Sequence, residues 1–231
     1  MKKGIVGIFL LFMVCNMYVF ATDTKGSEKV VNIAFGLTLP PYVFENETGM
    51  EYDIIKKSLA LKGYSMKPFY VPFARVTVSV QNKTVDAAAT VNEDSGMKDV
   101  FYSESHISYQ NVVVALASKK YKIEKVADLA DKSIVAFQNA TAYLGPEFAA
   151  MAKKNVGYKE VPNQDSQIAM LYKERTDTIV TDVNIFKYYK STSAKVEKKP
   201  GQDEAIYSIF PTVKYKVAFA DKKVRDDFNE G

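Results

Sequence analysis

Short, nearly continuous apolar runs alternate with amphipathic segments along this chain, and that alternation limits the folds open to it. The run VVNIAFGL at residues 30–37 is typical of a strand buried on both faces of a sheet. The later runs NVVVALAS, SIVAF and TIVT have the same character. Residues 52–61 and residues 165–174, the latter with an apparent cap at Asp165, have apolar side chains at helical spacing. The alternation predicts an α/β fold with covered sheets.

Two further segments need a decision between strand and helix, or between one helix and two. In FARVTVSVQN, residues 73–82, valines alternate with polar residues, which is strand periodicity. The segment also stands between two predicted strands, where a parallel pair needs a crossover, so we predict a helix against its propensity. Residues 139–155 (NATAYLGPEFAAMAKKN) predict one helix with Pro146 near its start.

The pattern of the N-terminal residues predicts an export signal that is not part of the fold. Lys2 and Lys3 precede an apolar run over residues 5–20, and VFA ends at Ala21 with a small residue suited to signal peptidase. A membrane anchor is the competing interpretation. The run is short for a span and no basic residues follow it directly, so a signal peptide over residues 1–21 and a periplasmic location are favoured.

Composition excludes several classes of chemistry once residues 1–21 are removed. The remaining chain has no cysteine and a single histidine, His106, so disulfides, thiol catalysis and Cys or His-rich metal sites are excluded. No nucleophile motif accompanies that histidine. The formal net charge falls from +4 to +2 with the loss of Lys2 and Lys3. A charge so close to zero does not indicate a surface that binds nucleic acid. We therefore expect no metal, no cofactor and no catalytic residue.

A short pattern occurs twice. TVDAAATVN at residues 84–92 and RTDTIVTDVN at residues 175–184 both place Asp, three small or apolar residues, and then Thr. In both, a predicted helix precedes and polar residues follow. So short a match also arises by chance, and taken alone it favours coincidence. The alternative is two half-chains built alike, with strand ends that point polar groups at one ligand site.

Several stretches together resemble the extracellular solute-binding proteins of amino-acid ABC importers (family 3, type II periplasmic-binding fold). They are LPPYVFEN with GMEYDI, VPFARVTVSVQNKTVDAA, VFYSES, VADLADKSIVAFQNATA and LYKERTDTIVTD, spread over about residues 30–228. The resemblance implies two α/β lobes joined by two crossing hinge strands, with the ligand cleft between them. Lobe 1 would hold residues 30–112 plus 212–231, and lobe 2 residues 113–211. The C-terminal helix would be truncated relative to the family.

The sequence departs from this family at its ligand site. The family's arginine clamp for the ligand carboxylate should fall at Gly96, Met97 or Lys98, and none is arginine. Ala142 replaces the second threonine of the family motif, while Thr141 is kept. Asp182, which in the family pairs with the ligand ammonium, is present. An amino acid, an amine, a modified amino acid and a peptide-like fragment therefore all remain open as ligands.

The candidate ligand-binding residues follow from this resemblance and from their neighbours. Asp182 either caps the following helix, contacts the ligand, or does both. Tyr42 is either an apolar plug or a stacking surface, and Phe73 is either core or contact. Arg75, at the start of a predicted helix, is the candidate for the missing cation. The full set is Tyr42, Phe73, Arg75, Thr90, Asn92, Lys98, His106, Asn139, Thr141 and Asp182.

The resulting functional hypothesis is a non-catalytic, monomeric periplasmic protein that binds a small polar ligand, amino-acid-like or amine-containing. Its partner would be an inner-membrane ABC permease or a sensor. The alternative is a periplasmic enzyme on the same fold, of the dehydratase kind, since fold alone does not fix function. Such an enzyme needs a positioned general acid, and Glu93, Asp94 and Glu104 are the nearby candidates.

The signal-peptide interpretation predicts export and cleavage after Ala21. N-terminal sequencing of the secreted protein is expected to begin at or near Thr22, because a basic start, an apolar run and VFA occur in the order that signal peptidase needs. A mature protein that keeps Met1 and stays in the membrane contradicts this.

Overall fold

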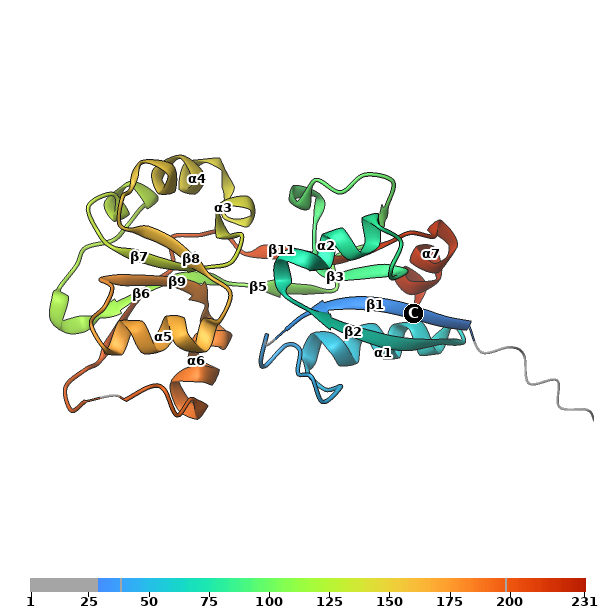
Figure 1. Cartoon of the computed structure of the whole chain (residues 1–231), viewed down its shortest axis with the longest axis horizontal. Coiled ribbons are helices and arrows are strands. Elements are labelled where there is room, and N and C mark those ends of the chain that lie inside the picture. Colours follow the sequence, from blue (N-terminus) through green and yellow to red (C-terminus); the bar gives the residue numbers. More distant parts are fainter. Residues whose placement is uncertain (1–28, 38, 198) are drawn as a thin grey trace, which may run out of the picture.

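The computed structural model describes residues 29–37, 39–197 and 199–231, and the predicted signal peptide at residues 1–21 lies outside these ranges. Two β-sheets lie side by side, each with its own helices, and the chain passes between them twice (Figure 1). We call the sheet containing β1 and its helices lobe 1, and the sheet containing β6 and its helices lobe 2. Within the described ranges, no helix is long and apolar enough to cross a membrane.

Lobe 1 is built from a mixed sheet with helices on both faces. Its strand order is β2 (Tyr64–Val71), β1 (Lys29–Gly36), β3 (Ala87–Val91), β11 (Val213–Phe219) and β4 (Phe101–Tyr102), with β5 (Ile107–Tyr109) also paired to β11. Its helices are α1 (Met50–Leu61), α2 (Phe73–Gln81), α7 (Lys222–Glu230) and the 3-10 turn η1 (Glu93–Ser95). The strand β1 runs parallel to β2 and β3, whereas β11 runs antiparallel to β3.

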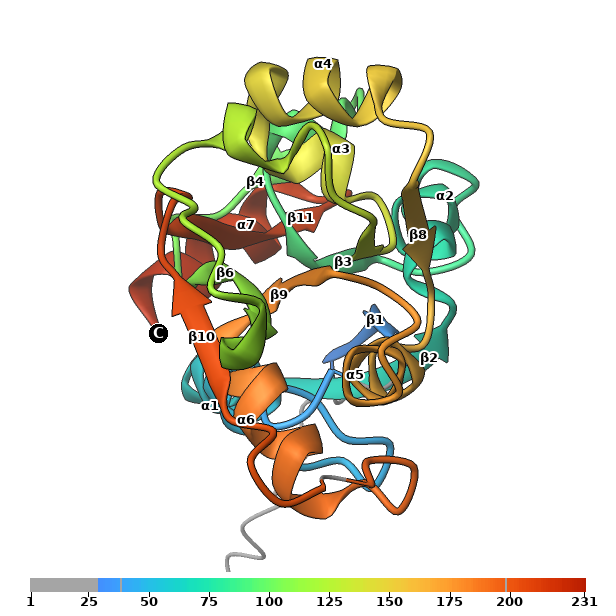
Figure 2. The same ribbon diagram turned by 90° about the vertical axis from the view of Figure 1, so that its left-hand side faces the viewer.

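Lobe 2 repeats this plan. Its strand order is β10 (Glu204–Tyr207), β6 (Asn111–Leu116), β9 (Thr178–Asp182), β7 (Ile134–Phe137) and β8 (Tyr158–Val161). Its helices are α3 (Ala140–Tyr143), α4 (Gly145–Lys154), α5 (Gln164–Tyr172) and α6 (Val183–Thr192), with 3-10 turns η2 (Ala117–Lys119) and η3 (Val126–Leu129). The strand β7 is parallel to β8 and β9, and β6 is antiparallel to β9. Figure 2 shows α4 on one side of this sheet and α5 and α6 on the other.

The two passages between the lobes run from β5 into β6 and from β10 back to β11. The predicted lobe boundary at residues 112 and 113 falls inside β6, because Asn111 is already paired with Asp182 in the second sheet. The predicted return at residues 211 and 212 falls between β10 and β11. An α/β fold with two lobes and two crossing segments is therefore the architecture that the sequence predicted.

Alternating strand residues divide each core into two layers. In β1, Ile33 and Phe35 belong to the layer shared with α1 and α7, whereas Ala34 belongs to the layer under α2. In β7, Ile134 packs into the layer that includes α4, and Val135 into the layer shared with α5 and α6. Because both faces of these strands are covered, they read in the sequence as continuous apolar runs.

The segment with alternating valines is the helix α2, as predicted. Val76 and Val80 are buried one helical turn apart, while Val78 is 46% exposed. The valines therefore sort by helical period and not by strand period. The need to cross from β2 to β3, both parallel to β1, outweighs the β-branched propensity.

Two predicted helix boundaries are wrong. Residues 139–155 form two helices, α3 and α4, because the chain turns at Gly145 with φ 86°, in the left-handed region that ends a helix. The cap of α5 is Asn163, whose side chain accepts the N–H of Ser166, and Asp165 lies in the first turn instead.

The repeated sequence pattern corresponds to a repeated structure. Asp86 precedes β3 and accepts the backbone N–H of Asn32 in β1, at 2.8 Å. Asp177 precedes β9 and accepts the backbone N–H of Ser133, just before β7, at 2.9 Å. Each aspartate thus ties the start of a central strand to its parallel neighbour. The two aspartates of the repeated pattern therefore make the same kind of contact in both lobes.

The tie at Asp177 predicts an acid-sensitive contribution to stability. Burial alone would raise the pKa of Asp177, but hydrogen bonds from Ser133 and Tyr121 outweigh it and hold the pKa below its usual value. Such a group stabilises the fold above its usual pKa and loses that contribution as the pH falls. We expect Asp177→Ala to lower the unfolding free energy at pH 7 by about 1–3 kcal/mol, measured by urea denaturation.

The difference between wild type and Asp177→Ala should shrink as the pH is lowered past the usual aspartate range. Asp131→Ala is the matched control, because the Asp131 side chain is 81% exposed and its ion pair with Lys132 lies at the surface. A pH-independent difference, or an equal effect of the two substitutions, contradicts the prediction.

Candidate functional site

A small cavity, open at its mouth, lies between the two lobes and is lined by residues of both. Most of its wall is apolar or aromatic, and five polar side chains reach it: Thr90, Asn111, Gln138, Gln164 and Asp182. The apolar part of the wall is Leu37, Leu39, Phe73, Tyr109, Phe137, Pro162, Ile185 and Tyr215. Thr90 and Asp182, the last polar residues of β3 and β9, thus meet at one cavity as the repeated pattern predicted.

Asp182 is the acidic group of the wall and is 2% exposed. Its Oδ1 accepts the backbone N–H groups of Asn184 and Ile185, at 2.8 and 3.1 Å, which caps α6. Its Oδ2 accepts the N–H of Gln110, at 2.9 Å, in the first crossing segment. Burial raises the pKa of the Asp182 carboxyl, although these bonds oppose the rise. The aspartate therefore both caps the helix and lines the cavity.

Tyr42 joins the two lobes across the cleft. Its hydroxyl, carried by lobe 1, donates to Asp182 Oδ1 at 3.0 Å and accepts from Asn184 Nδ2 at 3.0 Å, both in lobe 2. Its ring stacks on Tyr109 with centroids 3.8 Å apart. Burial, and next the charge of Asp182, raise the pKa of Tyr42 above its usual value, so it stays a neutral donor. Tyr42 is therefore both a buried plug of lobe 1 and a stacking surface, but its ring stacks on Tyr109 of the protein itself.

Glu51, a residue that sequence reasoning missed, lies directly behind the cavity wall and is completely buried. It accepts hydrogen bonds from Thr90 Oγ1 at 2.9 Å and Tyr109 at 2.8 Å, and it contacts His106 Nε2 at 3.0 Å. Thr90 has φ 57°, an uncommon conformation for a β-branched residue, and this bond helps to hold it there. The signal was available in the sequence: Glu51 is four residues before the core residue Ile55, on the apolar stripe of α1.

Some predicted site residues lie away from the cavity. Arg75 is exposed, and its guanidinium makes no ion pair or hydrogen bond with the described part of the chain. Its neighbour Val76 faces the sheet, which turns Arg75 toward solvent. Lys98 is exposed and lines a separate surface pocket with Lys83 and Asp99. The structure therefore does not bring either cation to the cavity, and a ligand contact through them remains a prediction from the sequence.

Asn139 and Thr141 are occupied by an internal carboxylate. Glu160 accepts the backbone N–H of Asn139 at 2.7 Å, and both the N–H and Oγ1 of Thr141 at 3.2 and 3.1 Å. The hydroxyl of Tyr158 also donates to Glu160, at 2.8 Å. The donors that the family resemblance assigns to the ligand are thus directed at the protein's own side chain.

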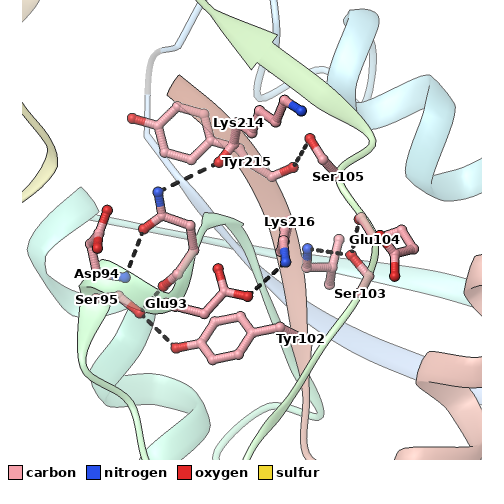
Figure 3. A network of polar contacts seen from close by, with 12 residues as sticks. Glu93, Asp94, Ser95, Tyr102, Ser103, Glu104, Ser105, Lys214, Tyr215 and Lys216 are labelled. Atoms are coloured by element: carbon pink, nitrogen blue, oxygen red, sulfur yellow. Dashed lines mark hydrogen bonds and ion pairs between the residues drawn. The ribbon is translucent and has the colours of Figure 1, made fainter. Parts of the chain in front are cut away.

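The polar cluster that follows β3 mainly holds lobe 1 together (Figure 3). Asn92 caps η1 by accepting the N–H of Asp94 at 3.1 Å, and its amide reaches the carbonyl of Lys214 in β11. Glu93 pairs with Lys216 of β11 at 2.6 Å. Asn92 therefore has a structural role, and of this stretch it is Thr90 that lines the cavity.

Within residues 29–37, 39–197 and 199–231 there is no group of His, Cys, Asp and Glu side chains that could hold a metal ion. Phe73, which sequence reasoning left between core and contact, lines the cavity and also contacts Tyr143 of lobe 2, with ring centroids 6.0 Å apart. Asn111, Gln138 and Gln164 were missed because each is a single amide near a strand or helix end, which no pattern distinguishes from a surface residue.

The two sheets, the two crossing segments and the cavity between the lobes define the type II fold of periplasmic binding proteins. No protein-family model matches the sequence, and no curated protein matches it. An ancestral arginine-binding protein bound to arginine is a structural neighbour, with a TM-score of 0.71, 18% identity, and coverage of 88% of this chain and 90% of that one.

Other solved structures agree. Holo ArgBP from T. maritima gives a TM-score of 0.68 at 18% identity, with 87% of this chain and 88% of that one covered. A substrate-binding protein of an ABC uptake transporter from Streptococcus pneumoniae, with bound histidine, gives 0.69 at 16% identity, with 87% and 84% covered. At these identities the similarity establishes the fold.

The buried position of Glu51 predicts a large loss of stability when it is removed. Glu51→Ala leaves the hydroxyls of Thr90 and Tyr109 and the imidazole of His106 without their acceptor, and we expect it to lower the unfolding free energy by about 2–5 kcal/mol. Glu51→Gln should cost less, because hydroxyls and a neutral imidazole can exchange donor and acceptor roles.

Urea denaturation measures both Glu51 variants. Glu93→Ala is the control, because the Glu93 side chain is 59% exposed in its pair with Lys216 and is expected to contribute about 0–1 kcal/mol. If Glu51→Ala and Glu93→Ala are equally stable, the network behind the cavity wall does not carry the stability assigned to it.

Proposed function

We propose that this protein is an exported solute-binding protein that captures a small polar ligand, amino-acid-like or amine-containing, between its two lobes. The observation that carries the proposal is the cavity at the junction of the lobes, where a buried carboxylate, Asp182, faces aromatic walls. Small-ligand sites use this combination of mostly apolar surface and few oriented polar groups. The ligand would pass to an ABC permease or a sensor in the inner membrane, and the protein would act as a monomer in the periplasm.

Binding without chemistry is favoured over the enzyme alternative by the position of the acids. Glu93, Asp94 and Glu104, the candidate general acids of a dehydratase, are all exposed and do not line the cavity. Burial acts to raise the pKa of Glu93, but the hydrogen bond and charge of Lys216, together with a backbone hydrogen bond, outweigh it and hold the pKa below its usual value. An acid that is ionised at neutral pH is poorly suited to donate a proton. The structural neighbours named above are also binding proteins.

Closure of the lobes around the ligand would follow from the contacts that cross the cleft. The Tyr42 hydroxyl bonds Asp182, and the rings of Phe44 and Tyr188 meet with centroids 5.6 Å apart. Tyr143 of lobe 2 also contacts Phe73 and Tyr215 of lobe 1, and all of these contacts would be lost in an open form. A ligand that contacts both lobes shifts the population toward the closed form. The hinge would be the two crossing segments, at Gln110 between β5 and β6 and at residues 208–212 between β10 and β11. The strands predicted as the hinge, over residues 111–118 and 211–219, lie largely inside the sheets of lobe 2 and lobe 1.

We expect a thermal-shift screen of amino acids and small amines to find a stabilising ligand, and small-angle scattering to show compaction when it binds. A ligand at a hundredfold excess over its Kd stabilises the folded state by about 2.7 kcal/mol, a shift that a melting curve resolves. NMR of the recovered ligand should show it unchanged. Conversion of the ligand would favour the enzyme alternative, and tight binding without compaction would contradict a closing cleft.

A further inference from the structure

The wall of the cavity holds a buried carboxyl group and, among the described residues, no cationic side chain. Asp182 is part of the wall, and Glu51 lies directly behind it, bonded to the wall residues Thr90 and Tyr109. No lysine, arginine or histidine lines the cavity in the described part of the chain. The one imidazole nearby, His106, contacts Glu51 and packs against Phe228 of α7, with ring centroids 6.0 Å apart. Buried charge acts over short distances in a poorly polarisable interior, so the field at the cavity favours a cation.

The hydrogen-bond donors of Asn139 and Thr141 in lobe 2 already bind a carboxylate of the protein, that of Glu160. Asn139 and Thr141 direct two N–H groups and one hydroxyl at Glu160. Gln138, the residue before Asn139, and Pro162, two residues after Glu160, both line the cavity. A carboxylate of a ligand would have to displace Glu160 to reach these three donors, and the unpartnered Nδ2 of Asn111 alone would leave most of its hydrogen bonds unmade, which is costly for a buried charge.

The rest of the wall suits an organic cation. Phe73, Tyr109 and Tyr215 line the cavity, and aromatic side chains attract ammonium groups. Tyr109 and Tyr215 remain neutral because burial raises their pKa well above the usual value. Asn111 is 2% exposed, and its Nδ2 has no partner, nor has the buried Oε1 of Gln138. The Gln138 oxygen is an acceptor ready for an N–H group of a ligand.

From these observations we infer that the ligand is an organic amine cation without a carboxylate, with its nitrogen between Asp182 and Gln138 and its carbon body against the aromatic wall. This inference rests on the proposed function and narrows it to one ligand class. It explains why neither Arg75 nor Lys98 reaches the cavity: no anionic group of the ligand is there to be met.

Calorimetry with matched pairs tests the inference, because each pair differs by one carboxylate. The probes are agmatine and arginine, cadaverine and lysine, histamine and histidine, and phenethylamine and phenylalanine. We expect at least one amine to bind about tenfold or more tightly than its amino acid, and no amino acid to bind more tightly than its amine. An amino acid that binds as tightly as its amine overturns the inference and leaves solute capture standing.

Two variants locate the effect. Glu160→Ala frees the donors of Asn139 and Thr141, so the preference for the amine should fall about tenfold. Because this preference is a ratio measured within one variant, partial unfolding does not imitate the result. Asp182→Asn removes the charge of the wall and should weaken the amine about tenfold or more, whereas Asp131→Asn, exposed in the same lobe, should not. An unchanged preference in Glu160→Ala overturns the role given to Glu160.

An Arg75→Ala variant separates this inference from the expectation drawn from the sequence. A ligand without an anionic group should bind it as it binds the wild type, whereas loss of binding would mean that Arg75 meets an anion and the inference is wrong. If none of the eight probes binds, the inference fails in this form. If the broader screen and the scattering experiment are also negative, the proposed function fails with it.

Discussion

The carboxylate of Asp182 is bonded at once to a helix, to a crossing segment and to the opposite lobe. It holds the first turn of α6, the N–H of Gln110 between β5 and β6, and the hydroxyl of Tyr42 from lobe 1. The two oxygen atoms of one carboxyl group thus hold a helix, a crossing segment and the opposite lobe. The orientation of the lobes, the first crossing segment and one wall of the cavity therefore depend on the carboxyl group of Asp182. Burying such a group is costly, and buried acids of this kind are common at functional sites.

A second buried carboxyl group, that of Glu51, holds side chains of the cavity wall in lobe 1, as Asp182 does in lobe 2. It fixes the hydroxyls of Thr90 and Tyr109, and so it orients two residues of the cavity wall without itself entering it. Tyr109 in turn stacks on Tyr42, which bonds Asp182. The two acids are thus joined through a pair of stacked tyrosines of lobe 1 and the hydrogen bond from Tyr42 across the cleft to Asp182, so a change in lobe orientation must alter that bond.

Apolar periodicity was sufficient to predict the α/β fold class and most of the long strands and helices, although β4, β5, β8 and the division between α3 and α4 were missed. The two-lobe fold, and with it the placement of Thr90 and Asp182 at one cavity, was predicted from the family resemblance together with the repeated pattern. Glu51, Glu160 and the aromatic wall depend instead on partners brought together from distant parts of the chain. The position of Glu51 on the apolar stripe of α1 indicates that it is buried, but no local pattern identifies the groups that bond it or the contacts of Glu160, so these roles became visible in the structure alone.

The two lobes share a plan, and their differences explain the site. In each, an aspartate before the central strand holds the neighbouring parallel strand, through Asp86 to Asn32 and Asp177 to Ser133. Each central strand then ends at the cavity, one with Thr90 and one with Asp182. Because the carboxyl-terminal ends of both central strands reach the same cavity, a ligand site there contains residues of both lobes. A small change in either lobe therefore changes the chemistry of the site. Directing Glu160 at Thr141 is a change of this kind: it keeps the lobe 2 donors satisfied while the charge of the cavity remains negative.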